Sequence, residues 1–187
     1  MRKSIYFILP CFFFCLPLAA QTSPAAEGPN ISIWLGFSVS TFNSDYGCGS
    51  NSPFSCWNHQ LIGISPYADT SAFLFGRIGA EGEARFMRWN GPNDMTMDSY
   101  LGGPRVRIWN HKKLLVSGKF LLGSARFNVA TFGAGDYFAF APGGSLDYRI
   151  ARRVSTRLDY EYQIWPGFPD SGLTPNGLSF GVSYAVF

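Results

Sequence analysis

The stretch VSTRLDYEYQI (residues 154–164) alternates strictly between two kinds of side chain. Every second residue from Val154 to Ile164 belongs to a largely apolar, tyrosine-rich set, and the residues between them carry three charges, on Arg157, Asp159 and Glu161. A period of two places these sets on opposite faces of a β-strand. A soluble β-sandwich also alternates, so the period alone does not show whether the apolar face meets lipid or a protein core. An apolar face rich in tyrosine opposite a charged face is typical of a barrel strand that faces lipid outside and a polar lumen inside.

The N-terminal residues have the pattern of a secretory signal. Arg2 and Lys3 precede an apolar stretch from Ser4 to Leu18, and Ala19-Ala20-Gln21 offers a cleavage point. A membrane anchor is the alternative, but the stretch is short for a spanning helix. We therefore expect a signal peptide at residues 1–20, a short N-terminal segment at 21–30 and one barrel domain at 31–187.

Composition narrows the class of protein further. The chain of 187 residues is 47% hydrophobic, 17% aromatic and only 14% charged, yet after residue 20 it contains no apolar run of helix-spanning length. Without residues 1–20 it has 13 cations and 12 anions, so no basic excess predicts binding to nucleic acid. An exported, apolar chain without spanning helices indicates the other fold that satisfies its backbone in lipid, a closed β-barrel.

Two cysteines remain after the signal, Cys48 and Cys56. Their spacing fits no zinc site, and an oxidising compartment favours a disulfide that closes a small loop. Two free thiols are the alternative.

Eight segments have the alternation of strands. Long loops are expected after the first, third, fifth and seventh segments, and short turns after the other three, the rhythm of an outer-membrane barrel. Pro66 predicts a strand rim or a bulge, and the opposite parity of Lys119 and Arg126 predicts a bulge near Gly123. The predicted segments are residues 31–42, 61–74, 78–89, 99–109, 114–129, 137–150, 154–164 and 178–187.

The charged positions of these segments share a face, which we expect to line the lumen. An eight-stranded barrel is just wide enough for its own side chains, so these charges should neutralise one another. Pairing Ile150 with Val154 across the turn sets Asp147 beside Arg157. Placing the midpoint of the connection between the third and fourth segments at Asp94 sets Glu83 beside Arg105 and Glu81 beside Arg107. A solvated face of a soluble sheet is the alternative. The predicted lumen network is Glu81, Glu83, Arg85, Arg105, Arg107, Lys119, Asp147, Arg149, Arg157, Asp159 and Glu161.

The chain resembles the small eight-stranded outer-membrane barrels of the OmpA-like and porin-family type. The resemblance rests on four soft motifs, at residues 79–85, 102–105, 143–149 and 181–187. It implies insertion by the outer-membrane assembly machinery, which reads a last strand ending in an aromatic residue, here through Tyr184 and Phe187. The sequence departs from the family at this point, because Phe187 has the parity of Ser183 rather than that of Tyr184.

Motifs for catalysis or metal binding are weak. His59 with Ser55 nearby is the one constellation for a lipid hydrolase or acyltransferase, and no Gly-x-Ser-x-Gly signature accompanies it. Two histidines without clustering do not predict a transition-metal site. Asp94, Asp98 and Asp136 are weak calcium candidates, and solvated loops account for them equally well.

The sequence therefore predicts an all-β fold, an eight-stranded antiparallel up-and-down transmembrane β-barrel in the bacterial outer membrane. We expect a monomeric, non-enzymatic structural or surface barrel with at most limited pore activity, no cofactor, and contacts with outer-membrane lipid and lipopolysaccharide. The alternatives are a small lipid-modifying barrel enzyme and a soluble periplasmic barrel that binds an apolar ligand.

Overall fold

The structure, a computed structural model, describes residues 31–42, 59–70, 77–89, 95–129, 133–168 and 172–186. The predicted signal peptide, Cys48, Cys56 and Phe187 lie outside these residues. Among the described residues, no helix has the length and apolarity needed to cross a membrane.

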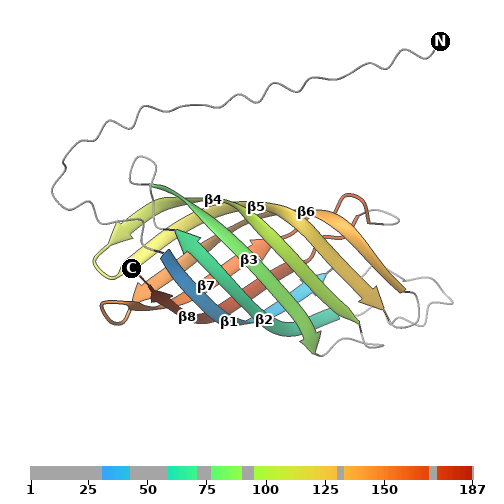
Figure 1. Cartoon of the computed structure of the whole chain (residues 1–187), viewed down its shortest axis with the longest axis horizontal. Coiled ribbons are helices and arrows are strands. Elements are labelled where there is room, and N and C mark those ends of the chain that lie inside the picture. Colours follow the sequence, from blue (N-terminus) through green and yellow to red (C-terminus); the bar gives the residue numbers. More distant parts are fainter. Residues whose placement is uncertain are drawn as a thin grey trace, which may run out of the picture.

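Eight strands form one closed barrel in which each strand is hydrogen-bonded to its neighbours in sequence and β1 closes on β8 (Figure 1). All neighbouring pairs are antiparallel, so the predicted fold class is confirmed. The strands are β1 (Ile31–Phe42), β2 (His59–Thr70), β3 (Ile78–Trp89), β4 (Thr96–His111), β5 (Leu114–Val129), β6 (Gly133–Arg149), β7 (Val154–Tyr162) and β8 (Asn176–Ala185).

The barrel has two distinct ends. Ile31 and Ala185 lie at one end, together with the connections β2–β3, β4–β5 and β6–β7, and we call it the terminal end. The other end, the loop end, holds the connections β1–β2, β3–β4, β5–β6 and β7–β8. The predicted rhythm of long and short connections is only partly correct: residues 130–132 alone join β5 to β6, because β6 begins earlier than predicted, whereas residues 71–77 join β2 to β3.

The structure differs from the prediction at two positions, the bulge expected near Gly123 and the rim or bulge expected at Pro66. Strand β5 pairs with β6 without interruption, so no bulge forms near Gly123, and Arg126 lies on the exterior opposite Asp136. The register shifts of the barrel fall instead between Ile62 and Gly63 of β2 and between Arg107 and Trp109 of β4. Pro66 stays inside β2, opposite Leu35 of β1.

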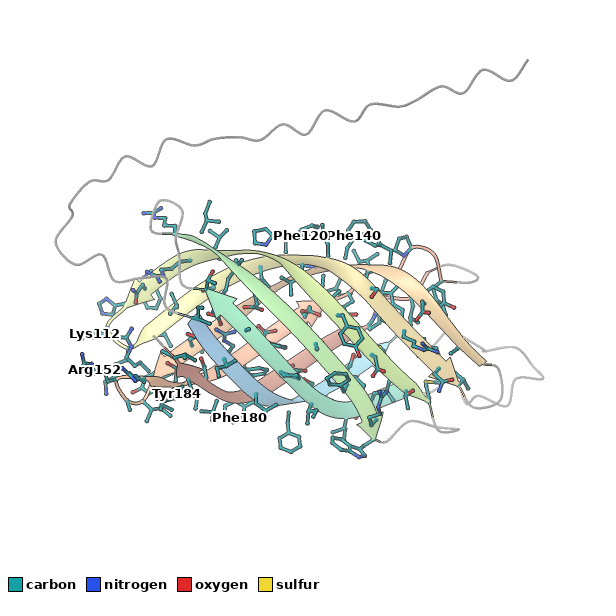
Figure 2. All side chains as sticks on the ribbon, in the orientation of Figure 1. Lys112, Phe120, Phe140, Arg152, Phe180 and Tyr184 are labelled. Carbon is teal, nitrogen blue, oxygen red and sulfur yellow. The ribbon has the colours of Figure 1, made fainter. Side chains whose placement is uncertain are left out.

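The exterior is a band of exposed apolar side chains. In β1 every second residue from Ile31 to Val39 is exposed, with Phe37 reaching 67%. Phe120, Phe140 and Phe180 project outward from the barrel wall (Figure 2). A soluble barrel would hide such side chains in its interior, so this band favours a lipid surrounding.

The interior divides into two halves of different chemistry. Toward the terminal end it is filled by buried charged side chains, from Asp69 to Glu161, which we call the charged half. Toward the loop end it is filled by a packed apolar cluster, the apolar half. The apolar half comprises Leu61, Met87, Met95, Met97, Leu101, Leu121, Ala125, Phe127, Val129, Ala139, Ala141, Trp165, Phe168 and Leu173, with Tyr137 packed against it.

Candidate functional site in the barrel lumen

The charged half is built from alternating positions of neighbouring strands. Glu81, Glu83 and Arg85 are successive inward residues of β3, and Asp159 and Glu161 are successive inward residues of β7. Since strand alternation turns every second side chain inward, the closed barrel brings these rows face to face across a narrow interior. Among the residues that the structure describes, ten charged side chains are buried, here called the lumen network: Asp69, Glu81, Glu83, Arg85, Arg105, Lys119, Asp147, Arg157, Asp159 and Glu161.

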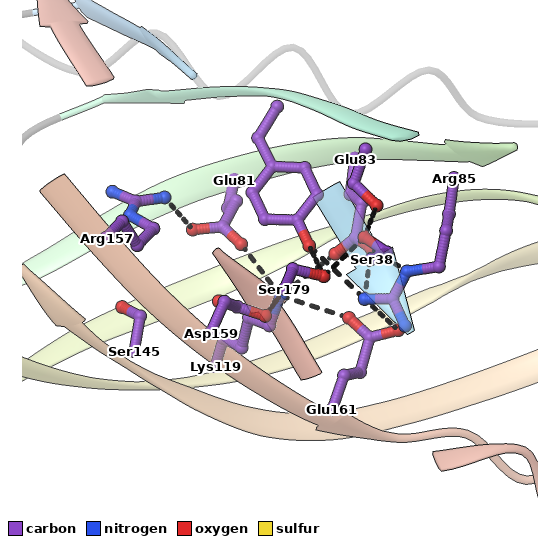
Figure 3. Close-up of polar contacts among 12 residues, drawn as sticks. Ser38, Glu81, Glu83, Arg85, Lys119, Ser145, Arg157, Asp159, Glu161 and Ser179 are labelled. Carbon is purple, nitrogen blue, oxygen red and sulfur yellow. Dashed lines mark hydrogen bonds and ion pairs between the residues drawn. The ribbon is translucent and has the colours of Figure 1, made fainter. Parts of the chain in front are cut away.

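Lys119 of β5 lies at the centre of this network (Figure 3). Its Nζ is 3.1 Å from an oxygen of Glu81, 2.9 Å from Glu83, 2.9 Å from Asp159 and 3.0 Å from Glu161. One ammonium group therefore contacts four carboxylates from β3 and β7, and it holds opposite walls of the barrel together.

Two arginines share two aspartates closer to the terminal end. Arg105 Nη1 lies 2.9 Å from Asp69 Oδ2, and its Nη2 lies 2.5 Å from Asp147 Oδ2. Arg157 reaches the same pair, with Nη2 at 2.6 Å from Asp69 Oδ2 and Nε at 2.6 Å from Asp147 Oδ1. Such charge-assisted contacts are short and directional, and each carboxylate here bridges two cations.

Arg85 connects the network to a group of hydroxyls. Its Nη2 is 2.7 Å from Glu83 Oε1 and donates to the Tyr67 hydroxyl at 3.2 Å. The Tyr67 hydroxyl donates in turn to Ser179 Oγ at 3.3 Å, and Ser179 Oγ lies 2.6 Å from Ser38 Oγ, which also contacts Ser65. The hydroxyls fill the side of the lumen formed by β1, β2 and β8, where the inward side chains of β1 are small or uncharged.

One of the two predicted hairpin registers is observed. Asp147 lies opposite Arg157 and Ser145 opposite Asp159, as counting from Ile150 and Val154 predicts. The predicted β3–β4 register is wrong, because each partner is shifted by four residues: Glu83 lies opposite Leu101, and Arg105 lies opposite Gly79. The midpoint of the hairpin lies nearer Pro92 than Asp94. Arg105 therefore forms its ion pairs with Asp69 and Asp147 of other strands and not with Glu83.

Two predicted network members lie outside it. Arg149 is exposed at the end of β6, opposite Ser155, and Arg107 is half-buried and makes no ion pair with any described residue. Both have inward parity, but they lie at the terminal rim, beyond the last layer of acids. Parity predicts the face of a residue and not its depth.

Sequence reasoning missed Asp69, which contacts Arg105 and Arg157. Its signal was present, because Asp69 has the parity of Ser65 and Tyr67 in β2, but Pro66 made that segment look irregular. Met87, Met97 and Phe127 were missed as lumen residues for another reason. They have inward parity with Arg85, Arg105 and Lys119, and an apolar side chain was expected to face lipid.

The lumen network carries more acid than base. It contains four cations and six carboxyl groups, a formal excess of two negative charges. Oxygens of Glu83, Asp159 and Glu161 lie within 4.8 Å of one another, a spacing that suits a metal ion. The Lys119 ammonium contacts all three, so a cation of the chain itself takes that position.

Residues after β7 fold inward to complete the apolar half. Trp165 and Leu173 exchange backbone hydrogen bonds of 2.9 and 3.3 Å, and Phe168 packs edge-on against Phe127 at 5.5 Å between ring centroids. Trp165 is fully buried and stacks near Tyr137 at 6.0 Å. The described side chains of this segment therefore fill the lumen toward the loop end.

Gln163 joins the two halves. Its Oε1 accepts from Trp165 Nε1 at 2.9 Å, and its Nε2 donates to Glu161 Oε1 at 2.7 Å and to Ser99 Oγ at 3.3 Å. A single buried amide thus links the apolar cluster to the ion pairs, and sequence reasoning had not singled it out.

The catalytic candidates of the sequence gain no support from the structure. His59 begins β2, but its side chain and Ser55 lie outside the described residues. His111 is exposed at the terminal end and stacks on Trp109 with ring centroids 5.6 Å apart.

The fold and its lumen define a small eight-stranded antiparallel barrel with an apolar exterior and a filled, partly charged interior. A comparison with known protein families and with curated protein sequences finds no match. Solved structures of the same architecture do match. Neisserial surface protein A (NspA) aligns with a TM-score of 0.60 at 12% identity, over 83% of this chain and 96% of that one.

Two further barrels match over the same share of this chain. Ail, the attachment invasion locus protein of Yersinia pestis, gives a TM-score of 0.53 at 17% identity and is covered over 97% of its length. The outer membrane protein OprG from Pseudomonas aeruginosa gives 0.52 at 10% identity and is covered over 95%. At these identities the likeness establishes the fold.

Proposed function

We propose that this chain is an outer-membrane β-barrel protein with a non-enzymatic structural or surface role and a closed lumen. The observation that carries the proposal is the inversion of the barrel. In the described part of the chain, apolar side chains cover the exterior, and the charged side chains of the lumen network are buried in the interior. A barrel in water would have the opposite distribution, and a barrel in lipid requires this one. The similarity of fold to NspA, Ail and OprG supports it.

Closure of the lumen follows from how both halves are filled. Lys119 contacts four carboxylates from opposite walls in the charged half, and Trp165, Phe168 and Leu173 fold into the apolar half. An ion that crossed the barrel would have to break both layers. The protein is therefore proposed to lack the open channel of a diffusion pore.

The route to the membrane belongs to the same proposal. Residues 1–20 direct export and are removed, and Cys48 and Cys56 form a disulfide after export. The assembly machinery then inserts the barrel by reading the last strand. Tyr184 supports this assignment, because it is exposed on the exterior of β8. The inserted monomer contacts outer-membrane lipid and lipopolysaccharide.

Fractionation and gel migration test the membrane barrel. The protein should be recovered with the outer membrane and should migrate faster in unheated than in heated detergent samples, since a closed barrel resists unfolding by detergent. Recovery of the processed protein in the soluble periplasmic fraction would refute the proposal.

Cysteine labelling tests the inversion residue by residue. Arg157→Cys replaces a lumen side chain, and the neighbouring Leu158→Cys replaces an exterior one that is 40% exposed. In membranes, a lipid-soluble thiol reagent should modify residue 158, and neither this reagent nor a charged one should modify residue 157. The reverse pattern would instead support the soluble ligand-binding barrel.

Planar-bilayer recordings test closure. The folded protein should show no long-lived conducting steps, whereas Trp165→Ala combined with Phe168→Ala should produce them more often. Stable ion conduction by the unaltered barrel would leave the membrane location intact and contradict the closed lumen.

A further inference from the structure

The two ends of the barrel differ in charge. The connections at the loop end contain Asp45, Asp94 and Asp170 and no lysine or arginine. The connections at the terminal end, residues 71–77, 112–113 and 150–153, contain no acid and five cations. With Arg149 they form a set of exposed cations, which we call the basic collar: Arg77, Lys112, Lys113, Arg149, Arg152 and Arg153.

The basic collar is continuous along one side of the rim. The Arg77 carbonyl accepts from the Arg107 amide at 2.8 Å, and the Lys113 carbonyl accepts from the Arg149 amide at 2.8 Å. The Arg153 carbonyl accepts from the Ala185 amide, also at 2.8 Å. Each bond joins one connection to the end of a neighbouring strand: the β2–β3 connection to β4, the β4–β5 connection to β6, and the β6–β7 connection to β8. Lys112 and Arg152 project from the same end of the barrel (Figure 2).

Cations of the collar lack the acidic partners that cations at the loop end have. Arg88 lies 2.6 Å from Asp98, and Arg126 lies 3.9 Å from Asp136. By contrast, no collar cation forms an ion pair with any residue that the structure describes. The collar therefore presents a field of one sign to its surroundings.

The conformation of Lys112 indicates that a cation is retained there at a cost. Lys112 has φ = 53°, and among the described residues it is the one non-glycine residue with positive φ. Glycine or asparagine adopts this conformation more readily in a two-residue hairpin turn. A lysine held in a less favourable backbone conformation is a reason to look for a function of its charge.

Exposed apolar residues beside the collar place it at the edge of the lipid-facing band. Ile108 is 68% exposed on β4, and Ile150 is 56% exposed directly after Arg149. Trp109 and Tyr148, on the same strands as Ile108 and Arg149, are also exposed. In membrane proteins, such aromatic side chains mark the boundary between hydrocarbon and headgroups. Arg149 follows Tyr148 directly, and Lys112 is three residues after Trp109. In a barrel that spans a membrane, these cations would lie beyond the aromatic boundary, among the lipid headgroups.

We infer that the basic collar binds the phosphates of anionic phospholipids in the leaflet around the terminal end. The inference rests on the proposed function, because the collar reaches headgroups only if the barrel spans a membrane. It fixes the depth and rotation of the barrel in the bilayer by an electrostatic contact on one rim, additional to the apolar band.

Spin-labelled lipids measure this preference directly. The folded protein is placed in phosphatidylcholine bilayers with a trace of spin-labelled phosphatidylglycerol or of spin-labelled phosphatidylcholine, and the fraction of each label immobilised at the protein is compared. The anionic label should be preferred about fivefold, the ratio that one cation near the surface supplies, and high salt should reduce the preference.

Matched variants assign the preference to the collar. The quadruple variant Lys112→Asn, Lys113→Gln, Arg152→Gln and Arg153→Gln keeps only Arg77 and Arg149 of the collar and should clearly lower the ratio. Arg88→Gln with Arg126→Gln, which removes cations from the loop end, should leave it unchanged. All four collar substitutions lie in connections, so the barrel strands are untouched.

The outcomes separate the two proposals. A protein that never acquires heat-modifiable migration in these bilayers refutes the membrane barrel. A folded barrel with equal immobilisation of both labels refutes the collar alone. Salt-sensitive binding of soluble polyphosphate to the collar in detergent, combined with equal immobilisation of both lipid labels, would show that the partner is a soluble polyanion and would also overturn the inference.

Discussion

The two halves of the lumen fill the same barrel by different physical means. In the charged half, the packing depends on ion pairs: Lys119 contacts four carboxylates, and Asp147 bridges Arg105 and Arg157. In the apolar half, the packing depends on side-chain volume, since Met87, Met97, Phe127 and Trp165 pack without a charged group among them. An ion network loses stability when a lost member leaves its partners uncompensated, whereas apolar clusters tolerate replacement by side chains of similar size.

Lys119→Met should produce the largest effect, because the side chain keeps its approximate length and loses its charge. Glu81, Glu83 and Glu161 would then keep only contacts with arginines, and Asp159 would lose the one ion pair that it makes among the described residues. Removing one partner of a buried ion pair lowers stability by roughly 3–5 kcal/mol, and we expect that loss in urea unfolding of the barrel in lipid vesicles.

Met87→Leu is the matched substitution in the apolar half. It conserves volume and should change the free energy of unfolding by less than about 1.5 kcal/mol. Equal losses for Lys119→Met and Met87→Leu would show that the two halves respond alike, and would contradict the difference between ion pairs and apolar packing. If Lys119→Met does not fold, Lys119→Arg offers a charge-conserving variant that should restore folding.

Trp165→Ala should have the next largest effect, and it should be localised. Removal of a buried tryptophan costs about 3–5 kcal/mol where the site cannot collapse, but Trp165 follows β7 and belongs to the inward segment, so it is not part of a barrel strand. Hydrogen exchange should therefore quicken in residues 163–168 and 172–175, while the amides of β3 and β4 keep their protection. Uniform loss of protection in all strands would mean that the inward segment supports the whole barrel.

Gln163 tests whether the halves are coupled. Gln163→Leu leaves Trp165 Nε1 and Glu161 Oε1 without their shared partner, and each lost bond of this kind costs roughly 1–2 kcal/mol. Trp165→Phe removes the donor and keeps an aromatic ring. In a double-mutant cycle, the two changes should be non-additive by about 1 kcal/mol; strict additivity would show that the halves are energetically independent.

The sequence could predict the fold because alternation survives in every strand, and three strands were predicted to the residue, at 31–42, 78–89 and 114–129. The β6–β7 register could be counted because Ile150 and Val154 flank a short turn. The β3–β4 register could not, because Asn90, Gly91, Pro92, Asn93 and Asp94 all favour turns, and no residue marks the centre of the connection.

The apolar half was beyond sequence reasoning for a different reason. Parity places Met87 and Phe127 in the lumen, but only the assembled barrel shows that a segment after β7 returns to pack on them. The contact of Phe168 with Phe127 joins positions far apart in the chain, and nothing in the local sequence around Phe168 encodes it. Local alternation determines faces, whereas long-range packing determines what fills the lumen.

Asp159→Asn should have the smallest effect and tests the excess of acid in the charged half. Asp159 Oδ1 lies 2.9 Å from Lys119, which keeps three other carboxylates, and Oδ2 has no hydrogen-bond partner. Removing one of two surplus negative charges should leave the free energy of unfolding unchanged or raise it by up to about 1 kcal/mol, since an uncompensated buried charge is unfavourable. Asp147→Asn on the neighbouring strand is the control, because both of its oxygens contact arginines at 2.5 and 2.6 Å. That variant should lose roughly 1.5–3 kcal/mol, and equal losses at both positions would mean that further cations or protons balance the network and that Asp159 is not in surplus.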